Sequence, residues 1–335
     1  MADRKIRWGI VSTADIGMKK VTPGIMKSPH SEVVALASRD LGKARAAVAE
    51  LGLPNARTYG SYEELLADPN VDAIYNPLPN HLHVPVTVAA ARAGKHVLCE
   101  KPISITATEA QELRAAPKTV RIAEAFMVRH HPQWHRAREI VRSGELGDIR
   151  LVRAAFLYYL DDPSNVRNLA DIGGGGLLDI GCYCVMSGRY LFEAEPKRVV
   201  ALVDRDPRFR TDRLASVIAD FGGGRQLSFV CGTQAAGRQT VEVFGTRASV
   251  EIVLPFNAPP DEMSAILVGS GTQRQLYRRE IIRPVDQYTE QAEAFALAIL
   301  EDKPVDFGIE DAISQMRVLD AIFRSEKSGT WENVK

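Results

Sequence analysis

Short apolar runs alternate with helix-forming segments through the first 125 residues of the chain. Each apolar run contains valine or isoleucine, and the runs cover residues 8–11, 33–37, 71–75, 96–99 and 120–123. The intervening segments are rich in helix formers and include residues 41–51, 62–67, 85–93 and 106–115. This alternation predicts βαβ units, and therefore a doubly wound parallel sheet with helices on both faces.

The pattern changes from about residue 151, where strand-like runs follow one another through turns that carry glycine or proline. These runs cover residues 149–159, 197–204, 215–221, 226–231, 240–244, 249–254 and 265–268. Helix-like segments return at residues 288–301 and 310–327. We therefore predict an α/β chain with a first domain at 1–124 and a second at 125–335, built on an antiparallel or mixed sheet. The last helices are expected to be able to pack back on the first domain.

Length and charge fit two domains and argue against a nucleic-acid partner. At about 150 residues per domain, 335 residues make roughly two domains. The chain has 42 Lys and Arg and 42 Asp and Glu, so it carries no net basic charge for DNA or RNA. No apolar stretch reaches about 18 residues, so we expect no membrane association. The four cysteines form no C-x-x-C pair and are too few in a chain of this length to suggest a disulfide scaffold, so we expect a reducing, cytoplasmic location.

The turn after the first strand has the spacing of a dinucleotide-binding turn. Residues 12–17 form a degenerate G-x-G-x-x-G, in which Ser12 and Ala14 replace the first two glycines. Small residues allow the backbone to approach a pyrophosphate at a helix start, with Thr13 and Ile16 as further candidate contacts. An ordinary strand-to-helix turn can carry the same letters, so that alternative stays open.

The end of the second strand favours NADP over NAD. An NAD site usually has an acidic residue there for the ribose 2′-hydroxyl, but this strand ends in Ser38 and Arg39. Ser38, Arg39 and Lys43 can bind a 2′-phosphate. In the alternative interpretation, Arg39 is a solvated loop residue and Asp40 is the helix cap or the ribose ligand.

Four longer motifs run in order along nearly the whole chain. They lie at residues 80–83 (NHLH), 93–102 (AGKHVLCEKP), 124–133 (EAFMVRHHPQ) and 173–183 (GGGGLLDIGCY). With these motifs the chain resembles the Gfo/Idh/MocA oxidoreductase family. Because Tyr183 stands where inositol dehydrogenases have histidine, the chain is most similar to the branch of glucose-fructose oxidoreductase, D-xylose dehydrogenase and dimeric dihydrodiol dehydrogenase. The resemblance implies an N-terminal Rossmann domain and a C-terminal α+β domain with a large, open-faced, mainly antiparallel sheet for oligomerisation.

A predicted strand is followed at its carboxyl end by Glu100, Lys101 and Pro102. Ligands bind at this end of the strands in open α/β sheets. A lysine there can lie beside nicotinamide and hydrogen-bond a substrate hydroxyl. The resemblance also implies a cis Lys101–Pro102 bond, and we place Glu100 with the cofactor-binding residues. The alternative is a surface lysine paired with Glu100.

Asp179 and Tyr183 are four residues apart, so on a helix both project from one face. Tyrosine has an ordinary pKa near 10, and a nearby lysine cation favours its phenolate. By resemblance, Tyr183 exchanges the hydroxyl proton, Lys101 orients the substrate, and Asp179 contacts the substrate or Lys101. The alternatives are a packed helix tyrosine and a structural carboxylate.

Further candidates follow from the resemblance. Pro79, Asn80 and His83 form a turn that the family places near the cofactor, and Arg129 is expected near nicotinamide or substrate. Arg167 precedes the glycine run and can bind sugar hydroxyls or a carboxylate. For His83 and Arg167, an ordinary structural or loop role is equally open.

Two other signals are discounted as ligand sites. The i,i+4 pair His131 and His135 is interrupted by Pro132 and has no acidic or cysteine partner at a suitable spacing, so no metal site is expected. The glycines at 173–176 fit a tight turn that brings backbone close to substrate at a helix start, rather than a phosphate cradle.

We therefore predict an NADP-dependent oxidoreductase that moves a hydride between nicotinamide and a ring carbon of a sugar or cyclic polyol. Oxidation of an aldose at C1 to a lactone is favoured. Keto-sugar reduction or trans-dihydrodiol oxidation at the same site is the alternative, and a non-catalytic ligand-sensing regulator is the alternative of another class.

A homodimer or homotetramer is expected through the second-domain sheet. A sheet with helices on one face must bury an apolar second face elsewhere. The apolar alternation that suggests such a face comprises Leu227, Phe229, Cys231, Val241, Val243, Ile252 and Leu254.

Overall fold

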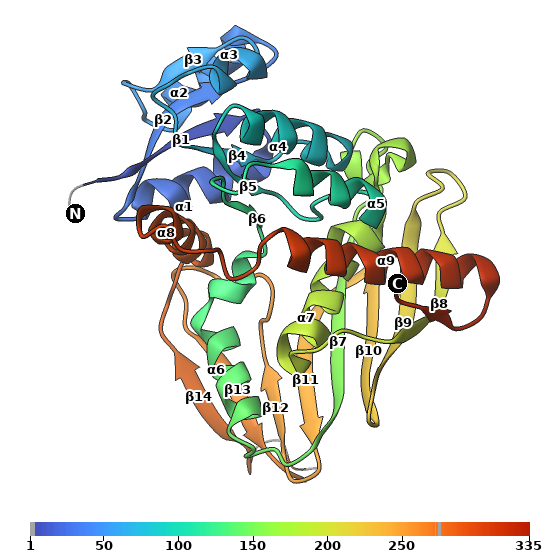
Figure 1. Ribbon diagram of the computed structural model, residues 1–335. Coiled ribbons are helices and arrows are strands. Elements are labelled where there is room, and N and C mark those ends of the chain that lie inside the picture. The colour runs from blue at the N-terminus through green and yellow to red at the C-terminus, as the bar shows by residue number, and fades with distance from the viewer. Residues whose placement is uncertain (1–3, 272, 274–275) are drawn as a thin grey trace. The chain divides into compact units, whose positions relative to one another are not determined.

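The computed structural model describes residues 4–271, 273 and 276–335 and divides into two compact units (Figure 1). The first unit is the chain up to His130 together with Asp286–Ile313, and the second is His131–Val285 with Ser314–Lys335. Ala125 packs in the core of the first unit. The domain boundary after residue 124 stays a prediction.

Among the described residues, the first unit contains a parallel sheet with the strand order β3-β2-β1-β4-β5-β6. This order confirms the predicted doubly wound Rossmann sheet. Its strands are β1 (Ile6–Val11), β2 (Ser31–Ala37), β3 (Arg57–Tyr59), β4 (Ala73–Asn76), β5 (His96–Cys99) and β6 (Ile122–Glu124).

The helices of the first unit cover the sheet and include one from near the end of the chain. Phe295 of α8 packs 5.5 Å from Trp8 of β1, ring centre to ring centre, and Ala292 and Ala296 join the same core. This burial explains why α8 belongs to the first unit. The helices are α1 (Thr22–Lys27), α2 (Leu41–Glu50), α3 (Tyr62–Leu66), α4 (His83–Arg92), α5 (Ala107–Ala110) and α8 (Gln287–Leu300), with shorter turns η1 (Gly17–Val21), η2 (Asn80–Leu82), η3 (Gln111–Ala115) and η4 (Met127–His130).

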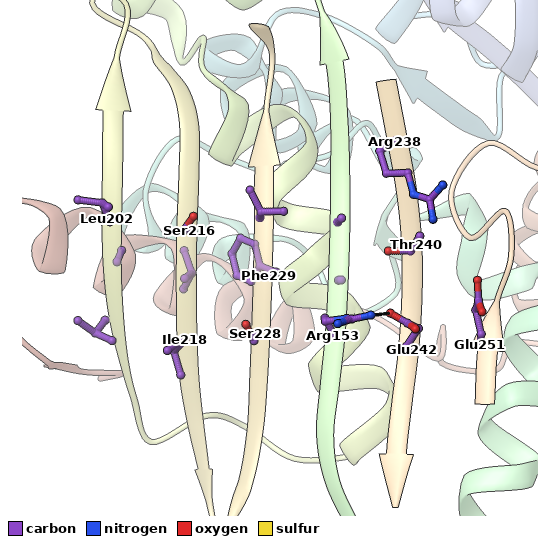
Figure 2. A pocket seen from close by; sticks show the side chains of 16 residues that line it. Arg153, Leu202, Ser216, Ile218, Ser228, Phe229, Arg238, Thr240, Glu242 and Glu251 are labelled. Atoms are coloured by element: carbon purple, nitrogen blue, oxygen red, sulfur yellow. Dashed lines mark hydrogen bonds and ion pairs between the residues drawn. The ribbon is translucent and has the colours of Figure 1, made fainter. Parts of the chain in front are cut away.

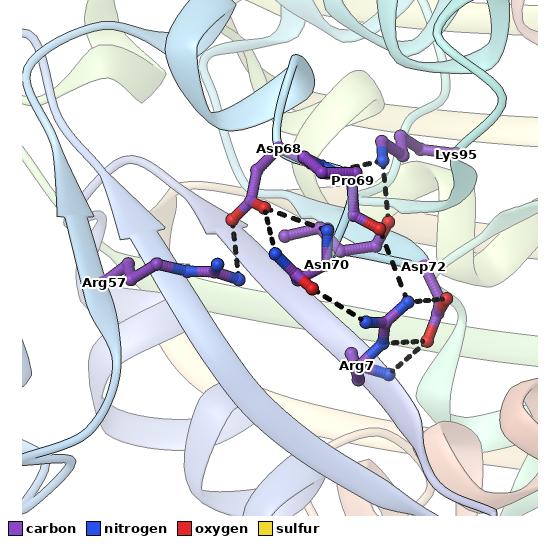
Figure 3. Close-up of polar contacts among 8 residues, drawn as sticks. Arg7, Arg57, Asp68, Pro69, Asn70, Asp72 and Lys95 are labelled. Carbon is purple, nitrogen blue, oxygen red and sulfur yellow. Dashed lines mark hydrogen bonds and ion pairs between the residues drawn. The ribbon is translucent and has the colours of Figure 1, made fainter.

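A polar cluster ties together the amino ends of β1, β4 and β5 (Figure 3). The buried Lys95 Nζ donates to the carbonyl oxygens of Asp68 and Val71, at 2.7 Å each. Arg7 makes a two-point contact with Asp72 through Nε at 2.9 Å and Nη2 at 2.8 Å. Lys95, which belongs to the 93–102 motif, therefore has a structural role at the amino end of β5. Lys101, in the same motif, follows the carboxyl end of this strand.

The second unit is built on a sheet in the order β14-β13-β12-β11-β7-β10-β9-β8-β15 over the described residues. Its pairings are antiparallel except for the parallel pair β7 and β10, which confirms the predicted mainly antiparallel sheet. The strands are β7 (Ile149–Tyr159), β8 (Arg198–Arg205), β9 (Asp212–Gly222), β10 (Arg225–Gly232), β11 (Gln234–Gly245), β12 (Ser249–Ile252), β13 (Ser264–Gly269), β14 (Arg278–Ile282) and β15 (Glu332–Asn333).

Helices cover one face of this second sheet. A Cβ on Gly188 of α7 would lie 3.2 Å from the Cβ of Leu227, and a Cβ on Gly181 would lie 3.0 Å from the Cys231 Sγ. The helical segments of this unit are α6 (Pro132–Arg142), η5 (Val166–Asn168), η6 (Ala170–Ile172), η7 (Leu177–Gly181) and α7 (Cys182–Phe192), while α9 (Ile309–Ser328) begins in the first unit and continues in the second.

The apolar alternation expected to form an oligomer face belongs instead to the helix-covered face. Leu227 and Cys231 face α7, and all of the predicted set except Leu254 is buried within the chain. On β9 and β10, the residues that alternate with the buried ones, such as Ser216, Ile218 and Ser228, line the opposite face of the sheet. The predicted alternation is therefore explained by packing inside one chain and gives no support for an oligomer.

Candidate active site

The turn after β1 has the geometry expected for a dinucleotide. Ser12 adopts a left-handed backbone with φ 71°, and its Oγ accepts a hydrogen bond from the Ala14 N–H at 3.1 Å. Helical backbone begins at Asp15. Gly17, the last position of the turn, lies against Tyr75 of β4 and Pro77, at ordinary contact distance from where a Cβ would stand. Because the strand order reverses between β1 and β4, these residues fit a dinucleotide at the switch point.

At the end of β2, Asp40 caps α2. Its Oδ1 accepts hydrogen bonds from the N–H groups of Gly42 at 2.7 Å and Lys43 at 3.2 Å. Ser38 is buried, whereas Arg39 is exposed and lies close enough to the Tyr62 hydroxyl to oppose the rise that burial causes in the Tyr62 pKa. The cap is the role that the alternative interpretation gave to Asp40. Arg39 is thus an exposed cation at this strand end, and Lys43 in the first turn of α2 is exposed as well.

Glu100 anchors the turn that carries Lys101. The Tyr75 hydroxyl donates to Glu100 Oε1 at 2.8 Å, and the Lys101 N–H donates to Glu100 Oε2 at 3.3 Å. Burial and the adjacent Glu100 raise the pKa of Tyr75 well above its usual value, so its hydroxyl keeps its proton. The Lys101–Pro102 peptide bond is cis, as the family resemblance implied.

His83 ties two turns together at the same edge of the sheet. Its Nδ1 lies 2.6 Å from the Pro102 carbonyl oxygen and its Nε2 lies 2.6 Å from the Leu78 carbonyl oxygen. Burial lowers the pKa of His83 to about 4, so the ring is neutral near pH 7. The enclosed His83 ring therefore positions two turns, the one that carries Lys101 and the one that contains Pro79 and Asn80. Contact of these residues with the cofactor stays a prediction.

Arg129 is held inside the first unit. Its Nη1 lies 2.6 Å from Asp311 Oδ2, and its guanidinium carbon stacks 4.1 Å from the Phe307 ring centre and 5.0 Å from that of Phe126. The side chain is only 2% exposed. These contacts are structural, and a contact with nicotinamide stays a prediction.

In the second unit, one carboxylate oxygen of Asp179 contacts two other side chains. The Tyr158 hydroxyl donates to Asp179 Oδ2 at 2.5 Å, and Arg167 Nε lies 3.0 Å from the same oxygen. Burial raises the pKa of Tyr158 first and Asp179 raises it further, whereas Arg167 opposes the rise. The cluster therefore brings a guanidinium and a protonated phenol to one carboxylate oxygen of Asp179.

Sequence analysis did not single out Tyr158. Tyr158 is the penultimate residue of β7 and lies two positions after Phe156, which is buried on the helix-covered face. Side chains two apart on a strand share a face, so the parity of Val152, Ala154 and Phe156 was the signal that could have placed Tyr158 beside the helix.

Tyr183 lies on α7 in an aromatic environment. The side chain is 5% exposed, and its ring centre is 5.7 Å from that of Phe156 and 5.5 Å from that of Phe256. Asp179 precedes it by four residues, on the π-helical turn η7 that leads into α7. Lys101 belongs to the first unit and Tyr183 to the second, so their pairing stays a prediction.

The glycine run makes its close approaches within the chain. A Cβ on Gly174 would lie 2.6 Å from the Arg167 carbonyl oxygen, and a Cβ on Gly175 would overlap the Asp212 carboxylate. Asp212 Oδ2 accepts a hydrogen bond from the Leu177 N–H at 2.5 Å. The expected tight turn at a helix start is observed, but the groups it approaches are Asp212 and a neighbouring loop. The predicted approach to substrate is not needed to explain the glycines.

Asp212 is a buried carboxylate with a perturbed ionisation. Burial raises its pKa from 3.8 to about 7, opposed by the Leu177 N–H and the charge of Arg205. The other titratable groups that interact with it are Glu326 of α9, Tyr158 of β7 and Cys231 of β10.

This raised pKa predicts a pH-dependent stability. Between about pH 4 and pH 7 the folded state keeps a proton on Asp212 that the unfolded state loses, so the free energy of unfolding falls as pH rises through this window. Asp212→Asn lacks this proton. Urea unfolding at several pH values should therefore show wild type losing stability relative to Asp212→Asn between pH 4 and pH 7. A difference that stays constant with pH contradicts the prediction.

Neither a metal cluster nor a membrane helix is found in the described part of the chain. No group of three or more His, Cys, Asp or Glu residues with ligand geometry occurs there. His131 accepts a hydrogen bond from the Gln133 N–H at 3.1 Å, so it caps α6. Across the same residues, every helix is too short or too polar to cross a bilayer.

Comparisons with known proteins agree with both units. Residues 6–125 match the model described as "Oxidoreductase family, NAD-binding Rossmann fold", and residues 134–251 match the GFO/IDH/MocA C-terminal domain. An uncharacterized oxidoreductase of Rhizobium meliloti is 46% identical over 333 residues, covering 98% of this chain and 99% of that protein. D-xylose 1-dehydrogenase (NADP(+)) 2 of Haloferax volcanii is 37% identical over 325 residues, covering 96% and 98%.

Solved structures show the same fold over nearly the whole chain. A crystal structure of a 3-ketoreductase from Actinomadura kijaniata, in complex with NADP and TDP-benzene, matches with a TM-score of 0.89 and 27% identity. The match covers 96% of this chain and 98% of that one. The chain is therefore an oxidoreductase with an NAD(P)-binding Rossmann unit. It belongs to the Gfo/Idh/MocA oxidoreductase family, which confirms the resemblance seen in the motifs.

Proposed function

We propose that the chain is an NADP-dependent dehydrogenase that moves a hydride between nicotinamide and a ring carbon of a sugar or cyclic polyol, with oxidation of an aldose at C1 favoured. The observation that carries the proposal is the Tyr158–Asp179–Arg167 cluster one helical turn from Tyr183. It provides charged and hydrogen-bonding groups for hydroxyls beside a candidate proton acceptor. Similarity to the NADP-dependent xylose dehydrogenase supports the aldose.

In this proposal each side chain has one task. The bound cofactor supplies hydride chemistry at its nicotinamide ring. Tyr183 accepts the hydroxyl proton from the substrate, and Lys101 orients the hydroxyl and favours the phenolate. Asp179, held by Tyr158 and Arg167, accepts a hydrogen bond from the substrate or from Lys101.

Arg167 also bears on the charge of the substrate. Its guanidinium is ion-paired with Asp179, and Asp179 raises the pKa of Arg167. The pair balances one positive against one negative charge, so Arg167 adds no excess positive charge for a substrate carboxylate or diphosphate beyond that of Lys101. The carboxylate role predicted for Arg167 becomes the weaker option, and the preference for an uncharged aldose rests on the similarity to the xylose dehydrogenase.

Reduction of a keto-sugar is the second candidate, and similarity to the 3-ketoreductase favours it. The same proton transfers run in reverse, with Tyr183 donating to the new hydroxyl. Oxidation of a trans-dihydrodiol uses the same residues. A non-catalytic regulator is disfavoured because Lys101 and Tyr183 are both present.

A coupled screen tests the proposal. Aldoses, polyols, uronic acids and nucleotide-linked sugars are offered with NADP or NAD, and reduced cofactor is followed by absorbance; keto-sugars are offered with NADPH or NADH. The expected result is turnover of a neutral aldose or polyol with NADP. Turnover of only charged substrates contradicts the substrate class, and no turnover of any of them favours the regulator.

Arg39 is expected to select NADP over NAD. It is exposed at the end of β2, where a 2′-phosphate would bind, and Asp40 is occupied as a helix cap. Arg39→Asp removes a charge-assisted contact of about 1.5 to 3 kcal/mol, so NADP affinity should fall by about 10- to 150-fold relative to NAD. Fluorescence titration of both cofactors measures this ratio. Arg45→Asp, at an exposed arginine of the following helix α2, is the control, and tighter NAD than NADP binding by wild type overturns the assignment.

We also propose that two copies associate through the open face of the second sheet, as a dimer or a dimer of dimers. This face holds a hollow of about 750 Å³ with a mixed lining, including the Arg153–Glu242 ion pair, at 2.8 Å from Nε (Figure 2). Leu202 is 78% exposed and Ile218 is 42% exposed on it. Exposed apolar side chains beside satisfied polar ones suit a contact with a second copy.

Leu202→Asp is expected to shift the chain to a monomer, because it places an unpaired charge in the proposed contact. Light scattering at micromolar concentration measures the mass. Met26→Asp, at an exposed apolar residue of the first unit, is the control and should leave the mass unchanged. A monomeric wild type contradicts the proposal.

A cytoplasmic location is proposed on the state of the thiols. Cys99, Cys182, Cys184 and Cys231 are each buried, and none of them forms a disulfide in the described part of the chain, which suits a reducing compartment.

A further inference from the structure

Asp212 lies against the start of the helix that carries the candidate catalytic residues. We propose that Asp212 is a positioning residue, whose carboxylate fixes the first turn of the η7–α7 helix and thereby sets where Asp179 and Tyr183 stand. The inference rests on the proposed function for those two residues. It adds a residue from β9, a strand that none of the sequence motifs includes.

The contact is direct and closed to solvent. Asp212 is 2% exposed, and its carboxyl group meets the helix start. Its Oδ2 accepts from the Leu177 N–H, which is one of the first amides of the helix and lies two residues before Asp179. First-turn N–H groups lack partners within a helix, and an oxygen of the Asp212 carboxyl group supplies the missing acceptor for one of them. The contact therefore fixes the end of the helix from which Asp179 projects.

One glycine of the run makes room for this carboxylate. Gly175 has φ +127°, and a Cβ there would overlap the Asp212 side chain. Gly175 thus leaves the space into which the buried carboxylate reaches to meet the helix.

The same turn holds the second partner of Asp179. The Gly175 N–H donates to the Arg167 carbonyl oxygen at 2.9 Å, and the Gly174 N–H donates to the Leu169 carbonyl oxygen at 3.0 Å. Arg167 in turn contacts Asp179 through its guanidinium. Displacing the turn would therefore move both Asp179 and the arginine that pairs with it.

The test compares Asp212 with a matched carboxylate. Asp206 is also buried in the second unit, and its Oδ1 accepts from the N–H groups of Arg208 at 2.7 Å and Phe209 at 2.9 Å, in a turn before β9. Asp212→Ala, Asp212→Asn, Asp206→Ala and Asp206→Asn are measured for kcat, for KM of substrate and cofactor, and for Tm.

Asp212→Ala is expected to lower kcat by about 10- to 100-fold, since small displacements of reacting groups have effects of this size. KM for the cofactor should hardly change, because the cofactor turn lies in the other unit. Asp212→Asn should recover most of kcat, because its amide oxygen can still accept from Leu177. Asp206→Ala should lower Tm and leave kcat near normal. Equal loss of kcat in Asp206→Ala and Asp212→Ala overturns the proposal.

Glycine variants give a second measurement. Gly175→Ala should lower kcat as Asp212→Ala does, because its methyl group displaces the carboxylate. Gly223→Ala is the control, since Gly223 also has positive φ, at 63°, but nothing lies within 4 Å of a Cβ there. Normal kcat in Gly175→Ala contradicts the proposal.

Hydrogen exchange separates this inference from the proposed function. Asp212→Ala should raise amide exchange across residues 177–183, and Asp206→Ala should not, whatever reaction the protein catalyses. If Tyr183→Phe keeps full turnover while this exchange rises, the proposed function fails and the positioning of the helix stands. Unchanged exchange in Asp212→Ala overturns the positioning itself.

Discussion

Tyr183→Phe is expected to lower turnover by about 10²–10⁴-fold, the range typical of a lost general acid or base. The substitution removes the hydroxyl and keeps the ring, so the packing against Phe156 and Phe256 is retained. Cofactor affinity should hardly change. The measurement is kcat by absorbance of reduced cofactor, on the substrate found in the screen.

Tyr190→Phe is the matched control for Tyr183→Phe. Tyr190 lies on the same helix, and both tyrosines are 5% exposed. It packs against Trp134 and Arg138 and has no assigned part in the reaction. Its substitution should leave turnover near normal. Near-normal turnover in Tyr183→Phe, with hydride transfer shown to be rate-limiting by an isotope effect, would exclude Tyr183 as the proton acceptor.

Lys101→Ala should be at least as damaging as Tyr183→Phe, because the lysine both orients the substrate and favours the phenolate. The double variant should lose much less than the product of the two single losses, since groups that act as a unit are non-additive. Multiplicative losses would show that the two residues act independently. In that case His83 is not a ready substitute, because its ring is buried between two backbone carbonyls.

Much of the fold could be predicted because the sheets bury one or both faces. β7 spans residues 149–159 as predicted, since its apolar and polar positions alternate clearly. β14 (Arg278–Ile282) was missed because it is a largely exposed edge strand with two arginines and a glutamate. α6 (Pro132–Arg142) was missed because its sequence is mostly polar, and only one stripe that includes Trp134 is buried.

The candidate site was predictable where function follows directly from the end of a strand or from a helix spacing. Lys101 follows β5 and Asp179 stands four residues before Tyr183, so local sequence was enough to select them. Asp212 contacts Leu177 from 35 positions away, and Tyr158 reaches Asp179 from 21 positions away. These partners are determined by how β7 and β9 pack against the helix. That packing cannot be predicted from any single stretch of the sequence.

Asp179→Asn is expected to lower turnover by about 10- to 150-fold, because it weakens contacts of Tyr158 and Arg167 to a charged acceptor that are each worth about 1.5 to 3 kcal/mol. The loss should fall mainly on kcat if Asp179 acts in the reaction, and Tm should fall as well.

Tyr158→Phe should have the same direction and a smaller size than Asp179→Asn, because Arg167 still holds the carboxylate when the phenol hydroxyl is gone. Tyr159→Phe is the neighbouring control: Tyr159 is 66% exposed, and its hydroxyl donates to Asp161 at 3.3 Å. Its turnover should match wild type. If Tyr158→Phe is slower than Asp179→Asn, the hydroxyl must contact substrate directly, and the assignment of Tyr158 as a partner that holds Asp179 is wrong.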